Sequence, residues 1–256
     1  MDKVTQFHNL SHICISLIGA VLLLAIYYNI RKRFKTVLEE GNSIKRVDKG
    51  LLYFSFGMLV WVVSGIWAFV ANYLSTQGSV SYQIGVNILS TINNLFWLLA
   101  LYYMYDAPKF IYRNEKNVKI IAAIIIVVAT LTMLLSFIVS NDIFYGIKLI
   151  SVPDVLLTTF LCILMGVSFY RTFMHRDLKL VAFISIIAIG LLFISQLSDV
   201  FVGLDNDFVN QLIRIVSKTS LVSVFLVLAT SWVIQLANTP KPTEIRIRFL
   251  FRQKEL

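Results

Sequence analysis

The chain has 256 residues, of which 58% are hydrophobic and only 14% are charged, and its mean hydropathy is +0.78. Soluble domains contain roughly 45–50% apolar residues, so this composition excludes an ordinary soluble domain and indicates a polytopic protein embedded in a lipid bilayer. The net charge of +9 would suit a nucleic-acid partner in a soluble protein. Here the basic residues follow the membrane topology, so no nucleic-acid binding is expected.

Seven apolar segments are long enough to cross a bilayer, because a helical span needs about 20 residues for about 30 Å of hydrocarbon. In chain order they are residues 10–30, 51–74, 83–105, 119–139, 149–170, 180–199 and 210–237. The predicted fold class is all-α, a seven-transmembrane helix bundle over residues 1–237 followed by a basic cytoplasmic tail over residues 238–256. The first apolar run is longer than the roughly 7–15 residues of a signal peptide, so we expect it to be a span.

Basic residues gather in the connections on one side of the predicted bundle. Nineteen of the 23 Lys and Arg residues lie in residues 31–50, 106–119, 171–179 and 241–254. Cytoplasmic connections of membrane proteins are enriched in Lys and Arg, so the N-terminus is predicted outside and the C-terminus in the cytoplasm. We expect an integral protein of the bacterial inner (plasma) membrane.

Two histidines, His8 and His12, are four residues apart near the start of the first span and share one helical face. No third histidine lies near them to complete a zinc site, so both are predicted to be ordinary helix-contact residues and no metal is expected. Cys14 and Cys162 lie inside apolar spans, and both are predicted to be buried free thiols.

The third span, residues 83–105, carries a polar stripe. Asn87, Ser90 or Thr91, Asn94 and Trp97 recur every three or four residues, so they lie on one face from the outer surface to about mid-bilayer. Amides in lipid need hydrogen-bond partners. The stripe therefore indicates either a ligand site or interhelical hydrogen bonds, which contribute about 0.6–2 kcal/mol each.

The fourth span, residues 119–139, is apolar on nearly every side. A helix of this kind faces lipid or another subunit, so we place it at the periphery and expect any homo-oligomer to form through it.

The fifth span begins with Ser151, Pro153 and Asp154. Ser at an N-cap, with Pro and a carboxylate in the first turn, predicts a helix start at this point. The sixth span ends with Gln196 and Asp199, which share one face near the outer surface.

The seventh span contains Arg214 and Lys218 inside an otherwise apolar segment, on one helical face with Gln211. Cationic groups facing hydrocarbon are costly, so this face is predicted to line a polar pocket. The alternative is that Lys218 extends outward to the headgroups. The predicted ligand-binding residues all fall in the outer half of the bundle: Asn87, Asn94, Asp154, Gln196, Asp199, Arg214 and Lys218.

No catalytic motif is present: the sequence lacks HExxH, GxSxG and a phosphate-binding glycine loop, so no enzymatic activity is expected. A retinal cofactor on Lys218 is disfavoured because Arg214, not a carboxylate, lies four residues earlier and the third span has no acidic counter-ion. No cofactor is expected.

These features favour a sensor or receptor that binds a small anionic or zwitterionic ligand from the outer side and signals to a cytoplasmic partner through the basic loops and tail. In layout the bundle resembles the seven-helix sensory modules that precede bacterial signalling domains and, more distantly, G-protein-coupled receptors. That resemblance carries over no residues. The alternatives are a small-solute transporter or channel, and a non-catalytic membrane scaffold subunit.

Overall fold

Long apolar sequences fold as helices in a bilayer, because a helix satisfies its backbone hydrogen bonds within its own segment. The computed structural model describes residues 3–33, 44–74, 79–104, 106–138 and 144–174, together with positions 183, 186, 187, 190 and 216. The long helices in these ranges are α1 (Lys3–Arg33), α3 (Ile44–Tyr73), α4 (Val80–Tyr103), α5 (Glu115–Ile138) and α6 (Phe144–Met174). The described part of the chain is thus all-helical, as the sequence predicted.

Four of these helices contain stretches long and apolar enough to cross a membrane, which supports an integral membrane protein. The stretches are Asn9–Tyr28, Lys49–Tyr73, Ser81–Tyr103 and Glu115–Leu135. In α6 the apolar stretch is shorter, Leu156–Ser168, within a helix of 31 residues. The first five predicted spans overlap α1, α3, α4, α5 and α6, and the first four of these helices contain a membrane-length apolar stretch. The sixth and seventh, apart from isolated helical positions, and the tail lie outside the described residues.

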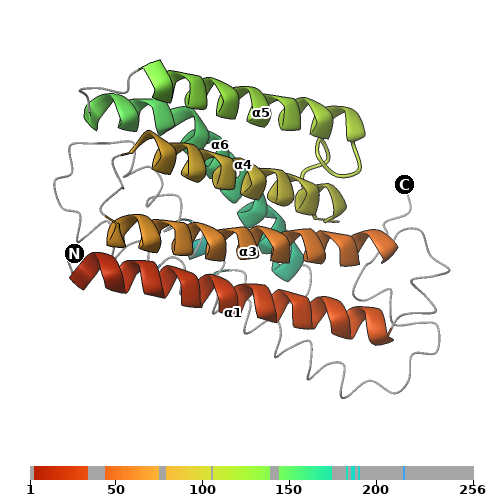
Figure 1. The fold of residues 1–256 in the computed structure, drawn as a ribbon. Coiled ribbons are helices and arrows are strands. Elements are labelled where there is room, and N and C mark those ends of the chain that lie inside the picture. Colours follow the sequence, from red (N-terminus) through yellow and green to blue (C-terminus); the bar gives the residue numbers. More distant parts are fainter. Residues whose placement is uncertain are drawn as a thin grey trace.

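The helices α1, α3, α4 and α5 lie side by side in a row, and α6 crosses behind α4 (Figure 1). Consecutive helices run in opposite directions. One end of the bundle therefore holds the end of α1, the start of α3, the end of α4, the start of α5 and the end of α6. We call it the basic end, because these described residues lie at or near it: Arg31, Lys32, Lys49, Lys109, Lys116 and Arg171.

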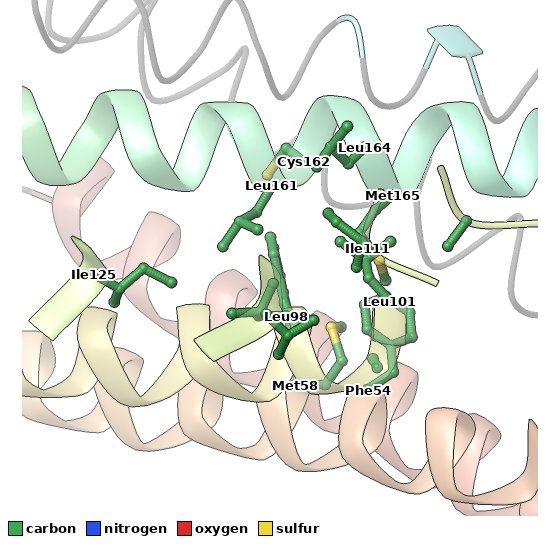
Figure 2. Close-up of a cluster of buried hydrophobic side chains, with 14 of the residues drawn as sticks. Phe54, Met58, Leu98, Leu101, Ile111, Ile125, Leu161, Cys162, Leu164 and Met165 are labelled. Carbon is green, nitrogen blue, oxygen red and sulfur yellow. The ribbon is translucent and has the colours of Figure 1, made fainter. Parts of the chain in front are cut away.

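The core lies where α4 and α6 cross. Leu98 and Leu101 of α4 meet Leu161 and Met165 of α6, and all four are at most 3% exposed (Figure 2). Ile111, in the connection between α4 and α5, is fully buried in the same cluster. That connection therefore packs onto the bundle, which fixes the start of α5 relative to α6.

Close packing of α3 on α4 depends on Gly57. A Cβ at this position would lie 2.5 Å from the indole ring of Trp97, far inside van der Waals contact. The ring is 2% exposed and makes an edge contact with Trp61, with centroids 4.9 Å apart. Small residues in membrane helices allow such approach, and here the missing side chain makes room for a tryptophan.

The start of α6 corrects the sequence prediction. The helix begins at Phe144, seven residues before the predicted N-cap Ser151, and Pro153 lies inside it. Proline cannot donate to the carbonyl four residues earlier, at Leu149, so one helical hydrogen bond is lost. Membrane helices tolerate proline, because neighbouring groups can satisfy the freed carbonyl and leaving the helix would expose more backbone to hydrocarbon.

The second correction concerns the cysteines. Both are free and Cys162 is buried, but Cys14 is exposed, so the prediction of two buried thiols was wrong for Cys14. Among the described helices α1 packs only against α3. Its contact face holds His12 and Ile13, and a turn of about 100° per residue directs Cys14 away from α3.

The fifth helix, α5, is buried on one face only. Val118, Ile125 and Ala129 are at most 9% exposed, and α5 packs against both α4 and α6. Its other faces carry Ile126 and Leu131, each more than half exposed. This exposure fits a helix at the periphery of the bundle; an oligomer contact through it stays a prediction.

Candidate functional site

Three of the predicted ligand-binding residues lie in the described part of the chain, and two elements supply them. Asn87 and Asn94 belong to α4, and Asp154 belongs to α6. The remaining four lie outside the described residues: Gln196, Asp199, Arg214 and Lys218. The described part of the candidate site is therefore the contact between α4 and α6.

At this contact Asn94 meets Thr158 and Asp154. The Asn94 Nδ2 donates to the Thr158 hydroxyl at 3.0 Å and lies 3.5 Å from the Asp154 carboxylate oxygen Oδ1. The Thr158 hydroxyl lies 3.2 Å from the Asn94 Oδ1 and 3.0 Å from the Asp154 backbone carbonyl, so it donates to one of these two acceptors. The sequence stripe on α4 thus meets the face of α6 that carries Asp154.

Helical spacing explains why these groups converge. Ser90 and Asn94 are one turn apart on α4, and Asp154 and Thr158 are one turn apart on α6. The side chain of Ser90 lies next to the Asp154 carboxylate. The choice between Ser90 and Thr91 is thereby resolved, since the Thr91 hydroxyl donates instead to the backbone carbonyl of Asn87 at 2.7 Å. We call Ser90, Asn94, Asp154 and Thr158 the α4–α6 polar cluster.

Burial makes this cluster energetically significant. Asn94 is fully buried and Thr158 is 8% exposed, while Asp154 is half-buried. A buried polar group without a partner is costly, so the mutual hydrogen bonds stabilise the helix crossing. Thr158 was not singled out as a site residue from sequence, although its position one turn after Asp154 is the signal that points to it.

The Asp154 carboxylate retains capacity for a further donor. Nitrogen–oxygen hydrogen bonds are usually about 2.7–3.2 Å long, so the 3.5 Å contact from Asn94 is weak. A carboxylate has about four acceptor positions, and the described donors fill only part of them. Within the described ranges the ion pair found is Lys119–Glu115, 3.8 Å long at the exposed start of α5, and Asp154 has no cationic partner there.

Asn87 extends the polar face of α4 by two turns away from the basic end. It is 6% exposed and lies seven residues before Asn94, on the same helical face. No hydrogen bond joins it to the α4–α6 polar cluster in the part of the chain described. Asn87 is therefore aligned with the cluster but is not brought into it.

A second buried polar pair lies on the neighbouring face of α4. The Asn93 Oδ1 and the Trp97 Nε1 have no hydrogen-bond partner among the described residues. Both press against Gly57, where a Cβ would lie 2.5 Å from the Trp97 Nε1 and 3.2 Å from the Asn93 Oδ1. Such a close approach leaves no room for a ligand, so this pair belongs to the packing of α3 on α4.

The described ranges contain no cluster of side chains arranged to bind a metal, and His12 has a structural contact. His12 Nε2 lies 2.8 Å from the backbone carbonyl oxygen of Trp61, which confirms His12 as a helix-contact residue. Across those ranges, no group of three or more His, Cys, Asp or Glu residues is placed to hold a metal ion. The α4–α6 polar cluster instead offers several oxygen acceptors, which suit a small positively charged group.

Comparisons with protein-family models, with curated proteins and with solved structures found no match to this chain. What the cluster can bind therefore follows from its own chemistry. One carboxylate, two hydroxyls and an amide accept hydrogen bonds from an ammonium group and orient it. An isolated anion would be repelled by Asp154 unless cationic residues stand opposite it.

Proposed function

We propose that the chain is a seven-transmembrane sensor or receptor that binds a small ligand from the outer side of a bacterial plasma membrane. The N-terminus lies outside and the C-terminus in the cytoplasm, which places the basic end at the inner surface. The receptor has no catalytic activity of its own. The sequence favoured an anionic or a zwitterionic ligand. Of these the zwitterion suits the site better, because the Asp154 carboxylate attracts an ammonium group and repels an anion.

The observation that supports this proposal is the meeting of Asn94 with Asp154, 60 residues apart in sequence, on two helices that cross in the bundle. A membrane protein has little reason to place a carboxylate among apolar helices unless it is paired or functional. The carboxylate here is half-buried and weakly bonded, so it is open to an incoming donor.

In the proposed complex the ligand is oriented by charge. Its ammonium group lies at the Asp154 carboxylate, which Asn94 contacts, while Thr158 holds the Asn94 amide. Its anionic group meets Arg214 and Lys218 of the seventh span, and Gln196 and Asp199 complete the outer rim. Such two-ended recognition favours a molecule carrying both charges, because a ligand with only one leaves an opposing group unpaired.

Signal transfer is proposed to follow α6. The helix contains Asp154 and Thr158 and continues to Met174 at the basic end. A ligand that pulls Asp154 away from Asn94 changes the packing of α6 on α4, and the helix carries this shift to the basic loops. A cytoplasmic partner then reads the positions of loops 106–119 and 171–179 and of the tail.

The test is ligand-dependent stabilisation of the full chain in lipid nanodiscs. Thermal unfolding is followed by tryptophan fluorescence, in the presence of a panel of amino acids and of matched carboxylic acids without an amine. We expect stabilisation by at least one zwitterion and little by its amine-free analogue. Asp154→Asn and Arg214→Ala abolish that stabilisation, because each removes one of the two opposing charges.

The matched control is Thr130→Val, because Thr130 on α5 is exposed and its hydroxyl bonds, among the described residues, within its own helix to Ile126. This variant keeps the ligand response. Unchanged binding and signalling in Asp154→Asn, Arg214→Ala and Lys218→Ala would remove the proposal. Uptake of the zwitterion into liposomes favours the transporter alternative instead, and co-purification of a fixed membrane partner without any ligand response favours the scaffold.

A further inference from the structure

An apolar groove of about 340 Å³ lies on the outside of the bundle between α5 and α6, near the basic end. Its lining residues come from α5, α6 and the connection that precedes α5: Phe110, Asn117, Ile120, Ile121, Ile124, Leu157 and Phe160. Six of these seven side chains are hydrocarbon. The groove is separate from the α4–α6 polar cluster, since it shares no lining residue with it.

The groove opens outward. Phe110, Ile120, Ile124 and Phe160 are 40–49% exposed, so their inner halves line the groove and their outer halves face the surroundings of the bundle. The α5 residues belong to the apolar stretch Glu115–Leu135, which is long enough to cross a membrane. A helix of this kind in a bilayer is bordered by lipid, so an acyl chain is the occupant that we consider.

Asn117 is the one polar residue that lines the groove, and it lies at the start of α5, near the basic end. Its side-chain amide donates to the backbone carbonyl of Phe110 at 2.9 Å, and its backbone N–H donates to the Asn114 side chain at 3.2 Å. These bonds tie the connection to the first turn of α5. The wall at this end is thus preformed, which lowers the entropy lost when a chain binds.

Two exposed lysines adjoin groove-lining residues in the chain. Lys109 immediately precedes Phe110, and Lys116 immediately precedes Asn117, so each adjoins a residue that lines the groove. The nearby Glu115 is paired with Lys119, on the other side of α5. The local charge next to the groove is therefore positive, as a phosphate group requires.

We propose that this groove binds one acyl chain of an anionic phospholipid, with the headgroup phosphate held by Lys109 and Lys116. Apolar lining selects a hydrocarbon chain, and the two lysines select a negative headgroup over a zwitterionic one. Each lysine near a membrane surface strengthens binding of anionic lipid by about fivefold. Together they predict a preference of about 25-fold over a lipid of the same chains without net charge.

Native mass spectrometry of the full chain tests the proposal. The protein is released from detergent with equal amounts of palmitoyl-oleoyl phosphatidylglycerol and palmitoyl-oleoyl phosphatidylcholine, and bound lipids are counted. The parent is expected to retain one phosphatidylglycerol in strong preference to phosphatidylcholine. The double variant Lys109→Gln, Lys116→Gln loses the preference, while Lys119→Gln keeps it because that lysine is engaged with Glu115.

The groove itself is tested by filling it. Ile124→Trp places an indole at the groove wall and is expected to lower retention of the bound lipid by about tenfold or more. Leu131→Trp is the matched control, since Leu131 lies on the same helix, is 53% exposed and does not line the groove. Equal retention of the two lipids by the parent overturns the proposal. So does equal lipid loss in Ile124→Trp and Leu131→Trp, or a dimer that forms through this face and excludes lipid.

Discussion

The amide nitrogen of Asn94 lies 3.0 Å from the hydroxyl oxygen of Thr158, which joins α4 to α6 by side chains that are both buried. The next residue, Thr159, is 4% exposed, yet its hydroxyl has no hydrogen-bond partner among the described residues. Two adjacent threonines are thus similarly hidden but differ in what their hydroxyls contact. This difference predicts opposite effects of the same substitution.

Thr158→Val is expected to destabilise the bundle. Valine keeps the shape but removes the hydroxyl, so the Asn94 amide loses its shortest side-chain contact and is left buried. Interhelical hydrogen bonds of this kind contribute about 0.6–2 kcal/mol in membrane proteins. The loss is measured as a lower free energy of unfolding in mixed detergent micelles. A double-mutant cycle with Asn94→Leu should recover a coupling of similar size, and a coupling near zero would show that the contact contributes nothing.

Thr159→Val is expected to be neutral or to stabilise the protein by about 1 kcal/mol. A buried hydroxyl without a partner costs about 1–3 kcal/mol, and the methyl group of valine removes this cost at almost the same volume. The same unfolding experiment compares it with Thr158→Val. A destabilisation equal to that of Thr158→Val would mean that the Thr159 hydroxyl has a partner.

The sequence predicted the α4 side of the polar cluster better than the α6 side. Asn94 and Asn87 recur at helical spacing within an apolar span, so one face of α4 could be identified without a structure. Which α6 residues face Asn94 depends on the crossing angle and axial offset of α6 relative to α4. The local sequence pattern predicts neither quantity. Helical spacing places Thr158 one turn after Asp154, but its pairing with Asn94 emerged only from the structure.

Local signals also failed where the membrane changes their meaning. Ser151 and Pro153 resemble the start of a helix in a soluble protein, but here α6 continues through them, since membrane helices tolerate an internal proline. Cys14 lies in an apolar span and was therefore predicted to be buried. In a bilayer an apolar residue is as well accommodated by lipid as by another helix, so hydropathy identifies the span but not its packed face.

Gly57→Ala is expected to destabilise the packing of α3 on α4. The added Cβ would lie 2.5 Å from the Trp97 ring, and the ring is confined by Phe54 and Trp61 on α3. Overpacking of this kind usually costs about 1–3 kcal/mol. Thermal unfolding measures the loss, and the intrinsic fluorescence of the folded variant should change because the Trp97 indole must move.

Gly190→Ala is the control for the glycine prediction. A Cβ at Gly190 meets nothing within 4 Å in the part of the chain that the structure describes. Alanine favours the helix over glycine by about 1 kcal/mol, so this variant should be neutral or slightly more stable. Equal destabilisation by the two substitutions would show that the Trp97 contact is not the cause.

The proposed orientation predicts which side of the membrane reaches each end of the bundle. In a background of Cys14→Ser and Cys162→Ser, a single cysteine is placed at Lys116, on the exposed start of α5 at the basic end, or at Ser79, the N-cap of α4 at the opposite end. A membrane-impermeant maleimide added to intact cells should label Ser79→Cys and leave Lys116→Cys unlabelled. Inside-out vesicles should reverse the result, because their cytoplasmic side faces the added reagent. This is the side predicted to hold 19 of the 23 basic residues. Labelling of Lys116→Cys in intact cells would show that the basic end lies outside. The proposed orientation would then be wrong, and an external ligand could not reach the α4–α6 polar cluster from the proposed side.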